Sequence, residues 1–266
     1  MRNNSNGAAF ATNGYFNLKT QDWLEKQRVA GKVVADSLSI LKGLVEEGHP
    51  ISALDLNNMI EKYILDNNCT ATFKGYKGFP AGVCISINKE LVHGIPKDIF
   101  FQQGDVISFD LGATYQGAIA DSAITCIYGK PRSERHVQLL AATEEALLAG
   151  IAAIKVGEHL GVIGHAIQNV AKKHKFASVT QYGGHGLDWN TPHAAPFVCN
   201  KGEVNEGVRI QQGLAIAIEP MLVIDSANTR VLDDGWTVVT NDIGAHFEHS
   251  IFVHEDRVEI ITDRNR

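Results

Sequence analysis

The sequence predicts the same order of elements twice, two helices followed by three strands. An N-cap signal at Thr20 opens a first helix, and Ser52 with Asp55 forms a capping box for a second helix that runs to Asn67. Three strand-like stretches follow, each rich in Ile, Val or Phe, over 82–87, 106–113 and 118–128. This first round of elements accounts for about half of the chain.

The second round predicts helices over 132–156 and from about 159 to 174. Strand-like stretches return at 214–224, 236–240 and 247–254. The residues of the two halves are not visibly alike, so the repeat is one of element order. We therefore expect an α+β fold, internally duplicated, in which the strands of both halves form one shared curved antiparallel sheet.

Composition excludes several classes of protein. The 266 residues suit one large domain, and 24 Lys and Arg against 30 Asp and Glu give a net charge of -6, which does not attract DNA or anionic lipid. No apolar run approaches the ~20 residues of a membrane span, and no signal peptide is visible. The four cysteines are scattered, as expected of free thiols. We expect a cytoplasmic protein with a flexible tail at 1–17 and a single domain at 18–266.

Two aspartates stand in the most informative segment, which runs from Gly104 to Asp121. If Tyr115 and Gln116 form the centre of a tight hairpin, Asp110 and Asp121 lie directly opposite each other among apolar neighbours. Like charges opposed on a buried ladder are destabilising unless a shared proton, cationic side chains or a metal ion neutralises them. The alternative is a frayed, exposed hairpin with two solvated carboxylates, and the segment alone does not separate the two.

The second half adds two carboxylates and one imidazole, each in apolar or glycine-rich surroundings. Glu219 ends an apolar strand before Pro220, Glu248 lies in another strand pattern, and His185 stands among three glycines that allow close approach of a ligand. Carboxylates and imidazole suit Mn, Fe, Co or Zn. Four carboxylates with one imidazole exceed the needs of one ion and match a pair of ions ~3.5–4 Å apart with bridging ligands.

Seven short segments follow one another along most of the chain, from Leu18 to His254. They are Val83-Cys84-Ile85-Ser86-Ile87-Asn88, Val92-His93-Gly94-Ile95-Pro96, Asp110 with Asp121, Gly184-His185-Gly186, Ile218-Glu219-Pro220, Gly235-Trp236-Thr237-Val238-Val239-Thr240 and Phe247-Glu248-His249. Taken in this order, they resemble the motifs of type I methionine aminopeptidases. The resemblance implies the pita-bread fold, an internally duplicated α+β architecture that agrees with the predicted order of elements.

The resemblance also implies roles for individual residues. The ligands of a centre with two divalent ions (Co, Mn, Fe or Zn) would be Asp110, Asp121, His185, Glu219 and Glu248. His93 and His193 would contact the scissile amide and the transition-state oxygen, and Glu219 would move a proton from the nucleophile to the leaving amine. The lining of the methionine pocket would be Tyr76, Phe79, Cys84 and Trp236.

The implied activity is removal of the initiator methionine from nascent chains with a small second residue, by a hydroxide that bridges the two ions. The implied substrates are nascent peptides, and we expect a monomer. The basic run 172–175 stands at a predicted helix end, where it is expected to complement the helix dipole, and a transient ribosome contact is the alternative. Two details depart from the family pattern: His193 follows His185 at a spacing one residue longer than usual, and Phe79 stands where Tyr is common. A monovalent-cation site of some relatives does not carry over, because the connection from Trp236 to Glu248 is shorter.

Two other hypotheses share the fold. An Xaa-Pro dipeptidase or aminopeptidase P would keep the ligands, but such enzymes usually carry a larger N-terminal domain and lack the segment 84–88 before His93. A pita-bread protein without catalysis, which binds peptides or proteins, would typically have lost ligands. Cleavage of Gly-Pro or the absence of bound metal would distinguish these hypotheses from the leading one.

Overall fold

A computed structural model describes residues 16–265. The predicted tail therefore lies outside the described residues except for Phe16 and Asn17. Phe16 packs against the hydrophobic core, and the Asn17 side-chain amide donates a hydrogen bond to Asp188 Oδ2 at 2.8 Å.

Within residues 16–265, four α-helices form where apolar residues recur at helical spacing. The Thr20 hydroxyl accepts from the Trp23 N–H, and the Ser52 hydroxyl accepts from the Asp55 N–H at 3.1 Å, so both predicted N-caps are confirmed. The third helix, capped by Ser133, is shorter than predicted at its C-terminal end. The helices are α1 (Gln21–Glu46), α2 (Ala53–Asp66), α3 (Glu134–Ala152) and α4 (Gly161–His174), and a short 3₁₀ helix η1 covers Tyr76–Gly78.

The strands of the described part of the chain form four antiparallel sheets. In the first sheet, β4 (Val106–Tyr115) pairs with β1 (Thr70–Ala71), β2 (Val83–Ile87) and β5 (Ala118–Ile127). The largest sheet has the order β15 (Val258–Ile260), β14 (His249–Val253), β9 (Ala215–Ile218), β7 (Gly184–Asp188), β8 (Thr191–Val198). The two small sheets have the orders β13 (Gly244–His246), β10 (Met221–Val223), β6 (Ala177–Ser178) and β11 (Thr229–Val231), β12 (Val238–Thr240), β3 (Glu90–Val92).

One predicted strand is divided into two. The stretch 214–224 forms β9 and β10, which belong to different sheets, because Pro220 has no N–H to continue the ladder after Glu219. The shared sheet expected from the sequence is therefore several sheets joined at particular points.

The two halves of the chain meet along β5. The Glu248 N–H donates to the Ala123 carbonyl at 2.9 Å, which links the segment between β13 and β14 to the edge of β5. Nearby, the Ser250 hydroxyl donates to the Asp121 carbonyl at 2.7 Å and accepts from the Asp121 N–H at 2.8 Å. These bonds bring strands of the second half against the strand that carries Asp121.

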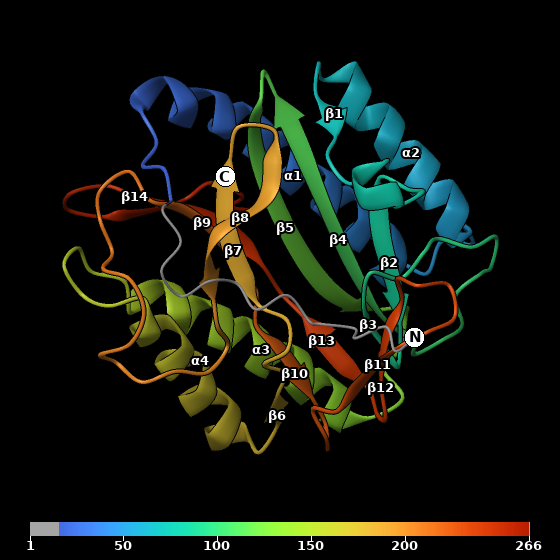
Figure 1. Cartoon of the computed structure of the whole chain (residues 1–266). Helices are drawn as coiled ribbons and strands as arrows, with labels where there is room; N and C mark the ends of the chain where they lie inside the picture. The colour runs from blue at the N-terminus through green and yellow to red at the C-terminus, as the bar shows by residue number, and fades with distance from the viewer. Residues whose placement is uncertain (1–15, 266) are drawn as a thin grey trace, which may run out of the picture.

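Helix pairs cover the strands on two sides (Figure 1). Helix α1 packs on β4 and β5, whereas α3 packs on α4 and on β9, β10 and β13. One large cluster of buried apolar residues runs through both halves and includes Trp23 and Phe109, each fully buried. The α+β architecture with two rounds of helices and antiparallel strands is therefore confirmed.

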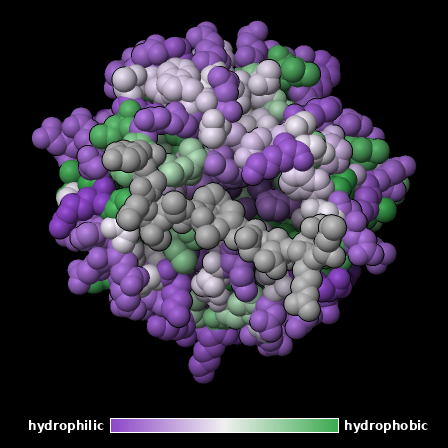
Figure 2. Space-filling view, viewed as in Figure 1, coloured by the Kyte–Doolittle hydropathy of each residue, from purple (hydrophilic) through white to green (hydrophobic). Residues whose placement is uncertain are grey.

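The face seen in Figure 2 is mostly hydrophilic, with apolar residues in small separate groups. Large exposed apolar side chains such as Leu65 and Phe100 are distributed over several elements. Within residues 16–265, no helix has both the length and the apolar character to cross a lipid bilayer.

Candidate functional site

Asp110 and Asp121 lie on one face of the β4–β5 hairpin. Asp110 pairs with Ala123 and Asp121 pairs with Gly112, so the two aspartates are diagonal neighbours. The prediction that they lie directly opposite each other was wrong, because the turn is formed by Gln116 and Gly117, with φ values of 47° and 88°. A tight two-residue hairpin favours positive φ at both positions, and Gly117 adopts it without strain.

The remaining predicted ligands come from the second half. His185 lies on β7, Glu219 directly follows β9, and Glu248 lies between β13 and β14. His185 Nε2 is 3.9 Å from Asp121 Oδ2, 3.7 Å from Glu219 Oε1 and 3.9 Å from Glu248 Oε1. The structure therefore brings together residues from four separate segments of the chain.

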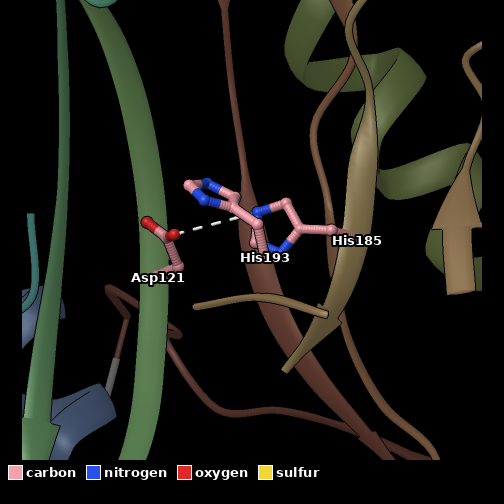
Figure 3. A group of neighbouring side chains, drawn as sticks. All are labelled: Asp121, His185 and His193. Atoms are coloured by element: carbon pink, nitrogen blue, oxygen red, sulfur yellow. Dashed lines mark ion pairs between the residues drawn. The ribbon is translucent and has the colours of Figure 1, made fainter. Parts of the chain in front are cut away.

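Three overlapping groups of these side chains could hold metal ions, and in each group the candidate ligand atoms lie within 4.8 Å of one another. His193 joins Asp121 and His185 in one of the groups, as Figure 3 shows. The groups are Asp121, His185 and His193; His185, Glu219 and Glu248; and Asp110, Asp121 and Glu248. All five predicted ligands thus belong to at least one group.

Buried oxygen atoms in this cluster fit a bound cation. Asp110 Oδ1, Asp121 Oδ1 and Glu248 Oε1 are buried and have no hydrogen-bond partner among the described residues. Burial of a carboxylate without compensation is strongly unfavourable. Divalent cations coordinated by these oxygens and by the His185 imidazole would supply the missing interaction.

The carboxylates perturb one another strongly in the protein without ions. Burial raises the pKa of Asp121 to about 8, with a further contribution from the charge of Glu219. Burial and the neighbouring carboxylates also raise the pKa of Asp110 and that of Glu248 well above their ordinary values. In Glu219, burial alone would raise the pKa, but the contact with His246 and the charge of His185 bring it below its ordinary value.

The two histidines predicted to contact substrate lie beside the cluster. The His193 ring on β8 lies 4.5 Å from the His185 ring, centroid to centroid, and both rings point toward Asp121 in Figure 3. His93 has a φ of 58° and its ring packs edge-on against Trp236. Burial lowers the pKa of His93 to about 4 and, together with the charge of His185, that of His193 to about 2, so both are neutral at pH 7.

The extra residue between His185 and His193 lies in the β7–β8 hairpin. The register of this pair shifts between His185 and Gly186 and again between Gly186 and Asp188. These irregularities absorb the longer spacing, and His193 still reaches the cluster.

An apolar cluster adjoins the carboxylates. Phe79 packs edge-on against Trp236, with ring centroids 5.1 Å apart, and Cys84 pairs with Asp110 across β2 and β4. Tyr76, predicted to line the same pocket, contacts the His193 ring, with ring centroids 5.1 Å apart. Sequence reasoning missed three further members of the cluster, namely Phe73, Ala81 and Ile95.

His246 is the other site residue that sequence reasoning missed. Its side chain is 1% exposed and its Nε2 lies 3.2 Å from Glu219 Oε2. The signal was its position two residues before Glu248, which in an extended segment places both side chains on one face.

Comparisons with known proteins agree with this geometry. The model of metallopeptidase family M24 matches residues 25–255. The methionine aminopeptidase of Mycoplasma capricolum subsp. capricolum is 40% identical over 94% of this chain and 99% of its own length, and methionine aminopeptidase 1 of Bacillus subtilis is 40% identical over 92% and 98%.

Solved structures with a similar fold include a methionine aminopeptidase and a prolidase. The crystal structure of methionine aminopeptidase from Thermotoga maritima superimposes with a TM-score of 0.90 at 35% identity, over 94% of this chain and 100% of that chain. A prolidase from Pyrococcus furiosus shares the fold, with a TM-score of 0.73 at 19% identity, and this chain covers 66% of it. The expected pita-bread fold is confirmed, and the chain belongs to metallopeptidase family M24 and, within it, to the methionine aminopeptidases.

Proposed function

We propose that this chain is a metal-dependent hydrolase that removes the initiator methionine from nascent proteins and peptides with a small second residue. The observation that carries the proposal is the convergence of Asp110, Asp121, His185, Glu219 and Glu248 around buried oxygens that lack partners among the described residues. In this proposal these five residues hold two divalent ions, of Co, Mn, Fe or Zn. When bound, the ions supply an activated bridging water and polarise the scissile carbonyl.

The residues of the chain would orient the substrate and move its proton. Glu219 is the one predicted ligand that is partly exposed, at 13%, and its lowered pKa keeps the carboxylate ionised at neutral pH, as a general base requires. His93 and His193 are neutral, so either can donate a hydrogen bond to the scissile amide or to the developing oxyanion without adding charge.

The apolar cluster would select methionine. Phe79, Cys84 and Trp236 present apolar and sulfur surface, which suits an unbranched thioether side chain. Because Cys84 pairs with Asp110, this surface begins directly beside the proposed metal site. A substrate seated there by its first side chain would have its first peptide bond near the ions, which explains removal of one residue.

In this proposal the chain works on nascent chains in the cytoplasm, as a monomer with one catalytic domain over 18–266.

Two members of the basic run 172–175 contact Glu145. Lys173 Nζ and His174 Nε2 each lie 2.7 Å from one of its oxygens. These contacts support an intramolecular role for the run over the alternative of a ribosome contact.

The proposal is tested by methionine release from Met-Ala-Ser. Protein stripped with a chelator is titrated with Mn or Co, and Gly-Pro serves as the control substrate. Cleavage of the methionine peptide alone, restored by metal, is the expected result. Cleavage of Gly-Pro would replace the proposed specificity with that of a proline-directed enzyme, and no cleavage of either peptide would contradict the proposed activity.

A further inference from the structure

His246 is a buried imidazole to which the proposed mechanism gives no role. It ends β13, where it pairs with Met221 of β10, two residues beyond Glu219. Its side chain is 1% exposed. A histidine in such a position calls for a partner, because burial of an unpaired polar group is unfavourable.

The backbone around His246 is fixed on both sides. The Thr125 hydroxyl accepts from the His246 N–H at 2.9 Å and lies 2.8 Å from the His246 carbonyl. The next N–H, that of Phe247, donates to the Pro220 carbonyl at 3.3 Å. These hydrogen bonds fix the backbone position of His246 beside the turn that carries Glu219.

The ring nitrogens point to one partner. Nε2 lies 3.2 Å from Glu219 Oε2 and 4.0 Å from Glu248 Oε2. Neither ring nitrogen makes a well-aligned hydrogen bond in the described part of the chain, so the contact of Nε2 with Glu219 Oε2 is a close approach that a small rotation of either side chain turns into a hydrogen bond. Glu219 thus lies between two imidazoles, with Oε1 toward His185 at 3.7 Å and Oε2 toward His246.

His246 differs from the predicted ligands in one respect. It belongs to none of the groups of potential metal ligands found among the described residues, although its neighbours Glu219 and Glu248 do. His246 contacts the predicted ligand Glu219 without being a predicted ligand itself. Contacts of this kind orient the ligand and tune metal affinity.

We infer that His246 is a positioning residue, whose Nε2–H holds Glu219 Oε2 and leaves Oε1 directed into the metal site. This inference rests on the proposed function, because it assigns Glu219 as a ligand and as the general base. Removal of the imidazole would leave Glu219 free to rotate, which would weaken metal binding and misplace the base.

The first test measures Mn affinity by isothermal titration calorimetry on the chelator-stripped full chain. His246→Leu is expected to weaken binding about tenfold or more, the range seen when a partner of a metal ligand is removed. His246→Gln keeps an N–H donor of similar reach and is expected to bind within about threefold of the unmodified protein. His254→Leu is the matched control, because His254 also contacts a glutamate, Glu259 at 2.8 Å, outside the candidate site.

The second readout separates positioning from general loss of structure. At saturating Mn, His246→Leu is expected to lower kcat for Met-Ala-Ser about tenfold with KM unchanged, and His246→Gln is expected to restore most of it. If His246→Leu does not fold, as judged by circular dichroism, His246→Asn is used in its place. The asparagine side chain is polar but too short for its amide to reach Glu219.

The outcomes are distinct. Mn affinity and kcat unchanged in His246→Leu would overturn the inference and leave the proposed function intact. Equal losses in His246→Leu and His246→Gln would also overturn it, because the N–H donor would then not be the relevant group. If the unmodified protein bound no Mn, the proposed function itself would fail, and the inference with it.

Discussion

Asp121 faces Asp110 diagonally across the β4–β5 hairpin, and both residues are buried. Burial and the charge of Glu219 bring the pKa of Asp121 to about 8, against about 4 in an unfolded chain. The folded protein without ions therefore holds a proton there that the unfolded chain has released at neutral pH. This difference links stability to both pH and metal.

Asp121 is predicted to make the metal-stripped protein less stable as the pH rises from about 4 to 8. The buried His93 and His193, whose pKa values are lowered, act in the opposite sense below about pH 6.5, so the net fall is expected between pH 7 and 8. In this window the folded state binds more protons at Asp121 than the unfolded state, so the free energy of unfolding falls with pH. Urea unfolding at pH 6, 7 and 8 in a chelating buffer measures the slope. Asp121→Asn should make it shallower, because Asp110 and Glu248, whose pKa values are also raised, still contribute. A slope that is the same in both proteins would contradict the prediction.

The turn of the same hairpin gives a second prediction. Gly117 has a φ of 88°, and a Cβ there would lie 2.9 Å from the Trp189 ring. Gly117→Ala is therefore expected to destabilise the protein by about 1–3 kcal/mol in urea unfolding. Gly43→Ala is the matched control: this glycine lies in α1, a Cβ at this position would meet no atom within 4 Å, and the substitution should stabilise by about 0.5–1 kcal/mol.

The tip of the β7–β8 hairpin is held by the N-terminal segment. Lys19 Nζ lies 2.8 Å from Asp188 Oδ1, and the Lys19 side chain is 3% exposed. Asp188→Asn would remove the charge that pairs with this buried ammonium, so we expect a loss of about 1–3 kcal/mol in stability. We also expect kcat to fall about tenfold, because His193 follows on β8 and small displacements of catalytic groups are costly.

The control for Asp188→Asn is Asp256→Asn. Asp256 is 77% exposed and its contact with Arg257 spans 3.4 Å, so its loss should change stability by less than about 0.5 kcal/mol. Equal effects of the two substitutions would show that the hairpin tip is not held by Asp188.

The apolar cluster gives a prediction about specificity. Trp236→Ala removes the ring that packs against both Phe79 and His93. KM for Met-Ala-Ser is expected to rise about tenfold or more, because one lost apolar contact in a pocket is worth about 1–3 kcal/mol. Steady-state kinetics with Trp236→Phe as the control measures this, and an unchanged KM for Trp236→Ala would place the methionine pocket elsewhere.

Local signals in the sequence predicted much of this structure. The caps at Thr20 and Ser52 depend on neighbouring residues alone, so they could be identified without knowledge of the fold. The five predicted ligands were identified by residue type and by resemblance to known motifs, and the structure places them in one cluster.

Other features depend on contacts between distant segments. The register that places Asp110 opposite Ala123 was missed because the turn was assigned one residue too early. The division of 214–224 follows from Pro220, but the partners of β9 and β10 are set by strands elsewhere in the chain. His246 was not identified because its role depends on contact with Glu219. Glu219 lies 27 positions away in the sequence and approaches His246 only when β10 pairs with β13.

The number of divalent ions bound per chain decides whether the proposed metal centre exists. Equilibrium dialysis of the chelator-stripped protein against Mn, followed by elemental analysis, should give two ions per chain. Asp121→Ala removes a carboxylate common to two of the three potential ligand groups and should bind one ion or none. Less than one ion per chain in the unmodified protein, or two ions in Asp121→Ala, would contradict the proposed metal centre.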